Sequence, residues 1–149
     1  MVTYSYKDVS DWFLSKESMS PKKLQKLTYY SEAWSNALFR ESLINDTRFE
    51  AWVHGPVSPE LYKDYKEYGW NEIPEKTDNS KKFINKVIEL LESVWVTYGD
   101  KSANELEALT HQEYPWIKAR EGYKELENSN VKIDPEVMGE YYRSIYIGG

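Results

Sequence analysis

Residues 20–59 constrain the fold more than any other stretch, because they join two helix starts through a tight corner. The first start is Ser20-Pro21: serine can accept a hydrogen bond from a free helix amide, and proline fits the first turn, where its missing N–H costs nothing. Apolar or small residues then recur every three or four positions, as on one face of a helix: Leu24, Leu27, Ser31, Trp34 and Leu38. The charged residues fall mostly on the other face, which we expect to be solvated: Lys22, Lys23, Lys26 and Glu32.

The second half of this stretch predicts a corner. Residues 41–48 have no regular pattern, residues 49–53 are suited to an extended segment, and His54-Gly55-Pro56 is a tight-turn sequence. Ser58-Pro59 is then a second helix start. We therefore expect a helix, a short extended corner and a returning helix, with at most a small two-stranded element around residues 43–53.

The remaining helices are predicted from start signals and spacing. A first helix should cover residues 5–18, and the helix from Pro59 should end at Gly69, before a loop over residues 70–80. The longest helix should run from Ser80 to Tyr98, at the centre of the core.

Three shorter elements should follow. Ser102 and Glu105 have capping-box spacing, and Pro115 can begin a turn that reaches Arg120. A loop over residues 122–132 precedes a last helix from Asp134-Pro135, which should bury Val137, Tyr141 and Ile145, with Met138 at the edge of that face. The sequence thus predicts a mainly α, compact single-domain bundle of six to seven helices over residues 1–149.

Composition limits where such a chain can work. It has 149 residues, enough for one domain with a real core, and no cysteine, which excludes disulfides and thiolate metal sites. No run approaches the roughly 20 apolar residues of a membrane helix, and the start MVTYSYKD lacks a secretory pattern. We expect a cytoplasmic protein without a membrane partner.

Charge and aromatic content indicate the kind of partner. The chain has 25 acidic and 19 basic residues, a net charge of −6, which argues against nucleic acid as a partner. It also has 6 Trp and 13 Tyr, the residue types that most often anchor protein interfaces. Composition therefore favours a protein partner.

Four strings match, in order and spacing, the pattern of one known family. They are SPKKLQKLTYYSEAW (residues 20–34), FEAWVHGPVSPELYKDYKEY (49–68), YGDKSANELEALTHQEYPWIKAR (98–120) and VKIDPEVMGEYY (131–142). With them the chain resembles the Panacea domain, the SocA-like antitoxin family found in bacterial and phage genomes. The resemblance runs from Tyr6 to Tyr146.

The resemblance implies an antitoxin that is not an enzyme, uses no cofactor or metal, and neutralises a co-encoded protein toxin by direct binding. It does not name the toxin, and the oligomeric state is not determined by the sequence. One alternative is a phage or prophage accessory protein that binds a host factor or delivers a target to a protease. A second is a metal-dependent enzyme that uses His54 and His111.

Residue chemistry gives the enzyme interpretation little support. His54 lacks a marked partner and is better explained as a turn residue bonded to backbone, and no zinc-binding spacing joins it to His111 and Glu113. Basic and aromatic residues in the first part of the stretch could form a nucleic-acid surface, but a solvated lysine face explains them better: Lys22, Lys23, Lys26, Tyr29, Tyr30 and Trp34. Phosphate-loop and serine-hydrolase motifs are absent.

Partner contacts are expected among the aromatic residues that flank the corner: Tyr29, Tyr30, Tyr62, Tyr65 and Trp70. An acidic face on the helix after the corner, with Glu60, Asp64 and Glu67, could meet a basic partner or could simply be solvated.

Overall fold

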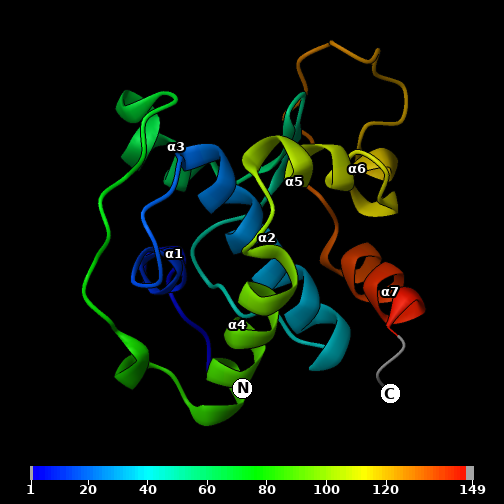
Figure 1. Cartoon of the computed structure of the whole chain (residues 1–149). Coiled ribbons are helices and arrows are strands. Elements are labelled where there is room, and N and C mark those ends of the chain that lie inside the picture. Colours follow the sequence, from blue (N-terminus) through cyan, green and yellow to red (C-terminus); the bar gives the residue numbers. More distant parts are fainter. Residues whose placement is uncertain (1, 147–149) are drawn as a thin grey trace.

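Helix α2 (Pro21–Leu38) runs through the middle of the molecule, and most other elements pack on it (Figure 1). The structure is a computed structural model that describes residues 2–146, so both predicted domain limits, 1 and 149, lie outside the described residues. α2 begins as predicted: the Ser20 hydroxyl accepts a hydrogen bond from the Lys23 amide at 3.3 Å, and Pro21 occupies the first turn.

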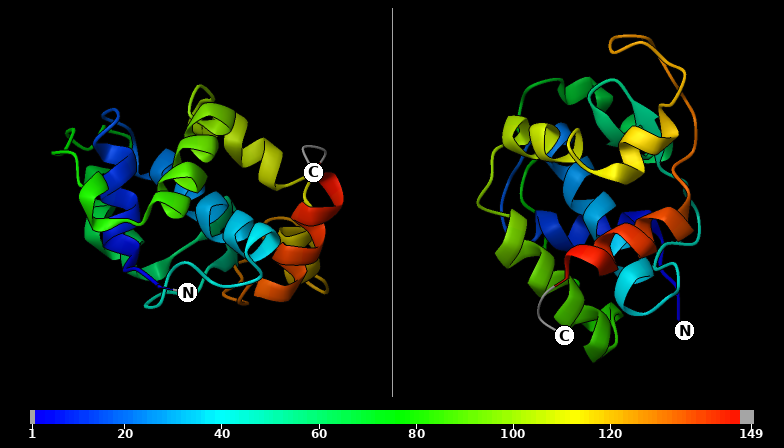
Figure 2. Two further views of the ribbon diagram at one scale, coloured as in Figure 1. Left: turned by 90° about the horizontal axis from the view of Figure 1, so that it is seen from below. Right: turned by 90° about the vertical axis from the view of Figure 1, so that its right-hand side faces the viewer.

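Six further α-helices surround α2 in the described part of the chain. They are α1 (Tyr6–Leu14), α3 (Pro59–Tyr65), α4 (Asn85–Tyr98), α5 (Ala103–Thr110), α6 (Tyr114–Ala119) and α7 (Pro135–Ile145). Two short 3₁₀ turns, η1 (Lys66–Tyr68) and η2 (Ser80–Lys82), lie at the two ends of the predicted loop after α3. Figure 2 shows α7 lying across the C-terminal half of α2. The prediction of a mainly α bundle is confirmed.

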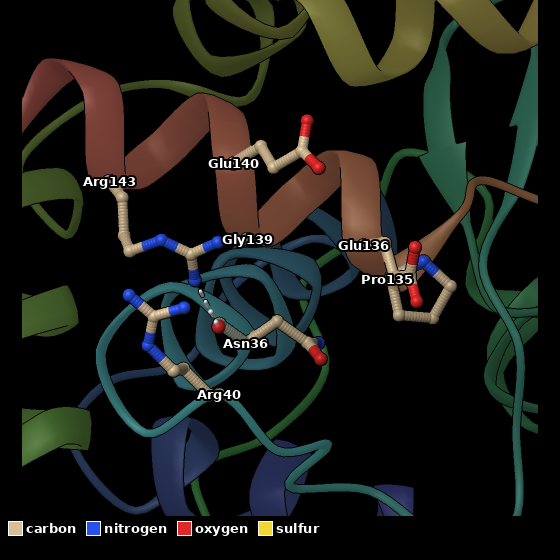
Figure 3. Close-up of a pocket in the computed structure, with 7 residues that line it drawn as sticks. All are labelled: Asn36, Arg40, Pro135, Glu136, Gly139, Glu140 and Arg143. Carbon is tan, nitrogen blue, oxygen red and sulfur yellow. Dashed lines mark hydrogen bonds between the residues drawn. The ribbon is translucent and has the colours of Figure 1, made fainter.

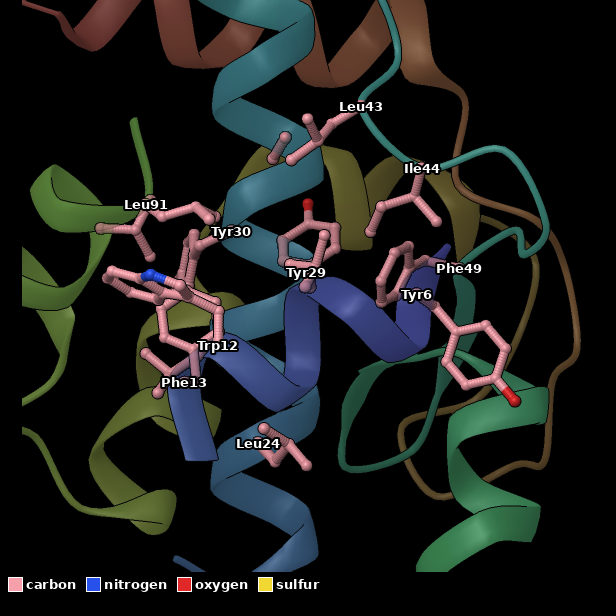
Figure 4. Packing of buried hydrophobic residues seen from close by; sticks show 14 of the residues in the cluster. Tyr6, Trp12, Phe13, Leu24, Tyr29, Tyr30, Leu43, Ile44, Phe49 and Leu91 are labelled. Carbon is pink, nitrogen blue, oxygen red and sulfur yellow. The ribbon is translucent and has the colours of Figure 1, made fainter. Parts of the chain in front are cut away.

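The core forms around α2 rather than around α4. Side chains from α1, α4 and the segment after α2 meet the aromatic rings of α2, as the labelled residues in Figure 4 show: Trp12, Phe13, Tyr29, Tyr30, Leu43, Phe49 and Leu91. Burying each such side chain contributes about 1.5–3 kcal/mol. The expectation of a central helix over residues 80–98 is therefore wrong: α4 has 14 residues against 18 in α2, and its residue Val96 faces solvent.

α2 is covered on the side that its sequence predicts to be solvated. Lys26 and Glu32 are both buried, which corrects the expectation for that face. The Glu32 carboxylate accepts hydrogen bonds from the amides of Leu43 and Ile44 at 2.9 and 3.0 Å, and it thereby holds the segment after α2 against the helix. A buried carboxylate is tolerated here because these bonds replace its hydration.

Two helix faces and ends also differ from the prediction. α1 stops at Leu14 rather than at residue 18, because the Ser15 hydroxyl and amide bond back to the carbonyl of Trp12. α7 buries Met138 and Tyr142, whereas Ile145 is exposed. The buried face of α7 is thus one residue away from the expected one.

A β-hairpin forms the corner after α2. β1 (Glu50–Trp52) and β2 (Gly55–Val57) are antiparallel, with Trp52 opposite Gly55, so the second strand lies beyond the predicted 43–53 element. Gly55 has φ +112°, and a Cβ there would lie 2.6 Å from Cε of Lys26. Only glycine fits this approach of the hairpin to α2. The Gln25 side chain also bonds both the amide and the carbonyl of Ser58, each at 2.9 Å.

Candidate functional site

A groove of about 430 Å³ opens between the N-terminal half of α2, the hairpin and α3. We call it the corner groove. Its aromatic lining comes from Trp52, Tyr62, Tyr65 and Trp70, and Lys22 and Lys26 are the lysines that α2 contributes to it. The exposed surface of the groove is mainly apolar, as in sites that bind an apolar group.

Three of the five predicted contact residues line this groove. Trp70 is 92% exposed, Tyr62 is 45% exposed and Tyr65 is half-buried. The ring of Tyr62 packs edge-on against Trp52, with 5.0 Å between ring centroids, so one wall of the groove is held by the hairpin. α3 and the turn after it thus present a row of aromatic side chains beside an open hollow.

The other two predicted residues, Tyr29 and Tyr30, lie in the core and not at the surface. Both are almost completely buried, because α7 and α4 cover the faces of α2 that carry them. In this fold neither ring can touch a partner, which corrects the expectation that they are surface anchors. The basic and aromatic surface considered for nucleic acid is therefore not formed along α2.

A buried polar network joins these two tyrosines to α6 and α7. The hydroxyls of Tyr30 and Tyr142 both donate to Oε1 of Glu113 at 2.8 Å, and the hydroxyls of Tyr29 and Tyr142 are 3.2 Å apart. Burial raises the pKa of Glu113 to about 7, even though the two tyrosine hydrogen bonds act to lower it. The sequence marks Glu113 only as a possible metal ligand; the surplus of tyrosine is the one sign of such a network.

Lys26 lies beneath the hairpin at the floor of the corner groove. Its side chain is almost completely buried, and its Nζ makes one long hydrogen bond, 3.4 Å, to the carbonyl of Pro56. Burial lowers the pKa of Lys26 to about 7, against the opposing effect of the Glu107 charge. Spacing alone cannot reveal this, because the residues that bury Lys26 come from the hairpin.

Glu107 links both sides of the groove floor. It forms an ion pair with Lys22 of α2, and its Oε2 is 3.1 Å from Nδ1 of His54 in the hairpin turn. Burial acts to raise the pKa of Glu107, but the hydrogen bonds from Lys22 and His54 outweigh it and the pKa is lower than usual. The expected bond of His54 to backbone is thus replaced by one to a carboxylate.

The structure brings both histidines into this cluster. The ring of His111 stacks on Trp116 with 4.1 Å between centroids. Burial lowers the pKa of His111, and the charge of Glu107 acts to raise it. Glu113, the third ligand considered, lies in the tyrosine network instead. Among residues 2–146 no group of three or more His, Cys, Asp or Glu side chains is arranged to hold a metal ion.

A second hollow, of about 280 Å³, lies between the end of α2 and α7 (Figure 3). Arg143 reaches from α7 to the carbonyls of Asn36 and Ala37, at 3.1 and 3.2 Å. These carbonyls belong to the last turn of α2, whose partial negative charge a cation offsets. Arg143 therefore has a structural task, and the hollow is a weaker candidate than the corner groove.

Comparison with known families decides the class of the chain. A family model described as "Antitoxin SocA-like, Panacea domain" matches residues 24–117. The chain belongs to this family. Comparisons with curated proteins and with solved structures found no match. No helix within residues 2–146 is long and apolar enough to cross a membrane.

The part of the chain that matches the Panacea model contains most of the features described above. It covers α2 from Leu24 onward, the hairpin, the aromatic row, Glu107 with both histidines, and Glu113, but not Lys22. Helices α1 and α7 lie outside it. Because Tyr142 of α7 bonds Glu113, the flanking helix is tied into the core of the matched region.

Proposed function

We propose that the protein is an antitoxin that neutralises a co-encoded toxin by direct binding, with the corner groove as its contact surface. Membership of the SocA-like family supports the role and implies a protein partner. The observation that carries the choice of surface is Trp70, a large apolar ring left 92% exposed beside Tyr62 and an apolar hollow. Aromatic side chains at the centre of an interface supply much of its binding energy.

We infer a non-enzymatic role from membership of the SocA-like family. The polar cluster has a use in the fold itself: Glu107 of α5 bonds His54 of the hairpin turn, and its ion pair with Lys22 fastens α5 to α2.

The second candidate function uses the same surface for a different partner. The protein would then be an accessory factor that binds a host protein or delivers a target to a protease. The groove favours neither function over the other, since an exposed aromatic row fits any protein partner. The genes next to this one discriminate between them.

A co-expression experiment tests the proposal. Each neighbouring gene is induced in a bacterium with and without this protein, and growth and co-purification are measured. We expect one neighbour to be toxic, and the protein to relieve that toxicity and co-purify with the toxin. If no neighbour is toxic, the antitoxin role is refuted and the accessory role takes its place.

Variants then test the surface. Trp70→Ala and Tyr62→Ala should each weaken toxin binding by about 2 kcal/mol, roughly 30-fold, as for central aromatic contacts. Val96→Ala is a matched control, because Val96 is 77% exposed on α4, which contributes no described residue to the groove. Toxin binding that is unchanged in both aromatic variants would rule out the corner groove while leaving the antitoxin role in place.

A further inference from the structure

The corner groove continues past the hairpin into another hollow. This hollow, of about 800 Å³, lies between the hairpin and the loop over residues 122–132, and we call it the loop hollow. Figure 1 shows the loop, in orange, rising beside the hairpin. Three residues line both the loop hollow and the corner groove: Trp52, His54 and Val57. The hairpin therefore separates two halves of one surface.

The loop hollow is mainly apolar, as the corner groove is. Leu126 of the loop is 79% exposed and lines the hollow together with Trp52 and Val57 of the hairpin. A single exposed leucine is ordinary, but this one stands beside a hollow that continues into a row of exposed aromatic side chains. Extended apolar surfaces of this kind mark contacts with other proteins.

The loop is fastened to β1 at both ends. Nη2 of Arg120 donates to the carbonyls of Lys124 and Glu127, at 3.1 and 2.6 Å. Nη1 of the same side chain donates to the carbonyl of Ala51 in β1 at 2.8 Å. At the far end of the loop, the amide of Ala51 bonds the carbonyl of Val131, also at 2.8 Å. A loop held in this way loses less conformational entropy when a partner binds.

Two amide side chains in the loop hollow suit an extended segment. Asn128 and Asn130 line the hollow and are exposed, and among residues 2–146 neither side chain has a hydrogen-bond partner. Each amide can both donate and accept. The main chain of an extended segment needs such groups, whereas a helix bonds its own main chain.

We propose that an extended segment of the partner protein crosses the hairpin and occupies both hollows. One apolar side chain of the segment packs against Tyr62 and Trp70 in the corner groove, and another packs against Leu126 in the loop hollow. The side chains of Asn128 and Asn130 bond its main chain. Because the partner is the toxin, this inference rests on the proposed function. It adds the conformation of the bound segment and a second contact site.

The test uses the whole protein and can be carried out before the toxin is identified. The protein is immobilised, and random peptides of about 16 residues displayed on phage are selected for binding. Such a peptide reaches roughly 50 Å when extended, which is enough to cross the hairpin. We expect the enriched sequences to share two apolar positions separated by several residues. The best peptide is then synthesised with a fluorescent label.

Peptide affinity is measured by fluorescence anisotropy for the wild type and four variants. Leu126→Asp and Tyr62→Ala should each weaken binding about tenfold or more. The double variant Asn128→Ala/Asn130→Ala should also weaken it about tenfold. Val96→Asp is the matched control for Leu126→Asp, because Val96 is 77% exposed on α4, which contributes no described residue to either hollow.

Four results would overturn the inference. They are no enriched peptide, peptide binding that is indifferent to any of the three changes in the hollows, a bound peptide that circular dichroism shows to be helical, and a wild-type dimer that Leu126→Asp makes monomeric in light scattering. The last result would assign the loop hollow to a second copy of this chain.

Failure of the proposed function looks different. Peptides that occupy both hollows while no neighbouring gene is toxic would refute only the antitoxin role. Toxin that Leu126→Asp binds and neutralises as well as the wild type does would refute only the contact in the loop hollow.

Discussion

Glu113→Gln tests the state of the carboxyl at the centre of the tyrosine network. Burial raises the pKa of Glu113 from 4.5 to about 7. At about 1.4 kcal/mol for each pKa unit, this rise corresponds to about 3 kcal/mol of unfolding free energy. Because the folded protein binds this proton more tightly than the unfolded chain, the contribution is complete below pH 4.5 and is lost as the pH rises through about 7.

Glutamine has nearly the same shape but cannot ionise, so the variant lacks this contribution. Its amide oxygen can still accept from the hydroxyls of Tyr30 and Tyr142. Between about pH 5 and about pH 8, the difference in unfolding free energy should move by about 2.5 kcal/mol in favour of Glu113→Gln. The comparison between two pH values removes any constant effect of the substitution.

Urea unfolding, followed by circular dichroism at both pH values, measures this difference. Glu89→Gln, on the exposed side of α4, controls for the loss of one negative charge. A difference between wild type and Glu113→Gln that is the same at both pH values would refute the reasoning. It would mean that the buried carboxyl keeps the same charge in the folded and unfolded chain across this range.

Three further changes test the corner and the loop over residues 122–132. Burial lowers the pKa of Lys26 from 10.5 to about 7, so between these values the unfolded chain binds more protons and the unfolding free energy of the wild type rises with pH. Urea unfolding of Lys26→Met at several pH values should lack this rise. A rise as large as that of the wild type would contradict the lowered pKa. Gly55→Ala should lower the free energy of unfolding by about 3 kcal/mol or more in thermal unfolding, since its Cβ would lie 2.6 Å from Cε of Lys26. Gly122→Ala, with φ +87° and open space around it, should cost only the backbone strain of about 1–2 kcal/mol. Equal losses in the two variants would contradict the steric argument. Arg120→Met removes the hydrogen bond from the guanidinium to the carbonyl of Glu127 (2.6 Å), which holds the loop over residues 122–132. Limited proteolysis should therefore cut this loop faster in the variant. An unchanged cleavage rate would mean that Arg120 does not anchor the loop.

Local signals in the sequence predict where helices begin. Ser20, Ser58, Ser102 and Asp134 all cap helices, and each hydroxyl or carboxylate accepts an amide hydrogen bond within three residues. These interactions depend only on neighbours in the sequence, so they can be found without the fold. The helix count and the two-stranded corner follow from the same kind of rule.

Burial around α2 could not be predicted in the same way. Helical spacing identifies one apolar face, but it does not say whether another segment covers the opposite face. Glu32 is buried because Leu43 and Ile44 fold back onto it, and Lys26 because the hairpin lies over it. The expectation of a surface position for Tyr29 fails for the same reason.

Part of the candidate site could be predicted from the sequence, and part could not. Tyr62, Tyr65 and Trp70 follow the corner directly in the sequence. Their side chains are exposed or half-buried because little of the chain covers the outer side of the short helix α3. The link from His54 to Glu107 joins residues 53 positions apart, and no local pattern marks such a pair. A long-range contact of this kind needs the tertiary fold.

The outer wall of the corner groove is fastened at its two ends. Gln25 and the buried Leu61 hold the beginning of α3, and the amide of Ile73 bonds the carbonyl of Met19 at 2.8 Å after the wall. Most of residues 62–72 between these points are exposed or half-buried. Tyr65 and Tyr68 of this span pack against the core, whereas Trp70 is almost fully exposed. Substitutions at the exposed positions should therefore disturb the core least, and under the proposed function these are the positions where a change of partner would cost the least stability.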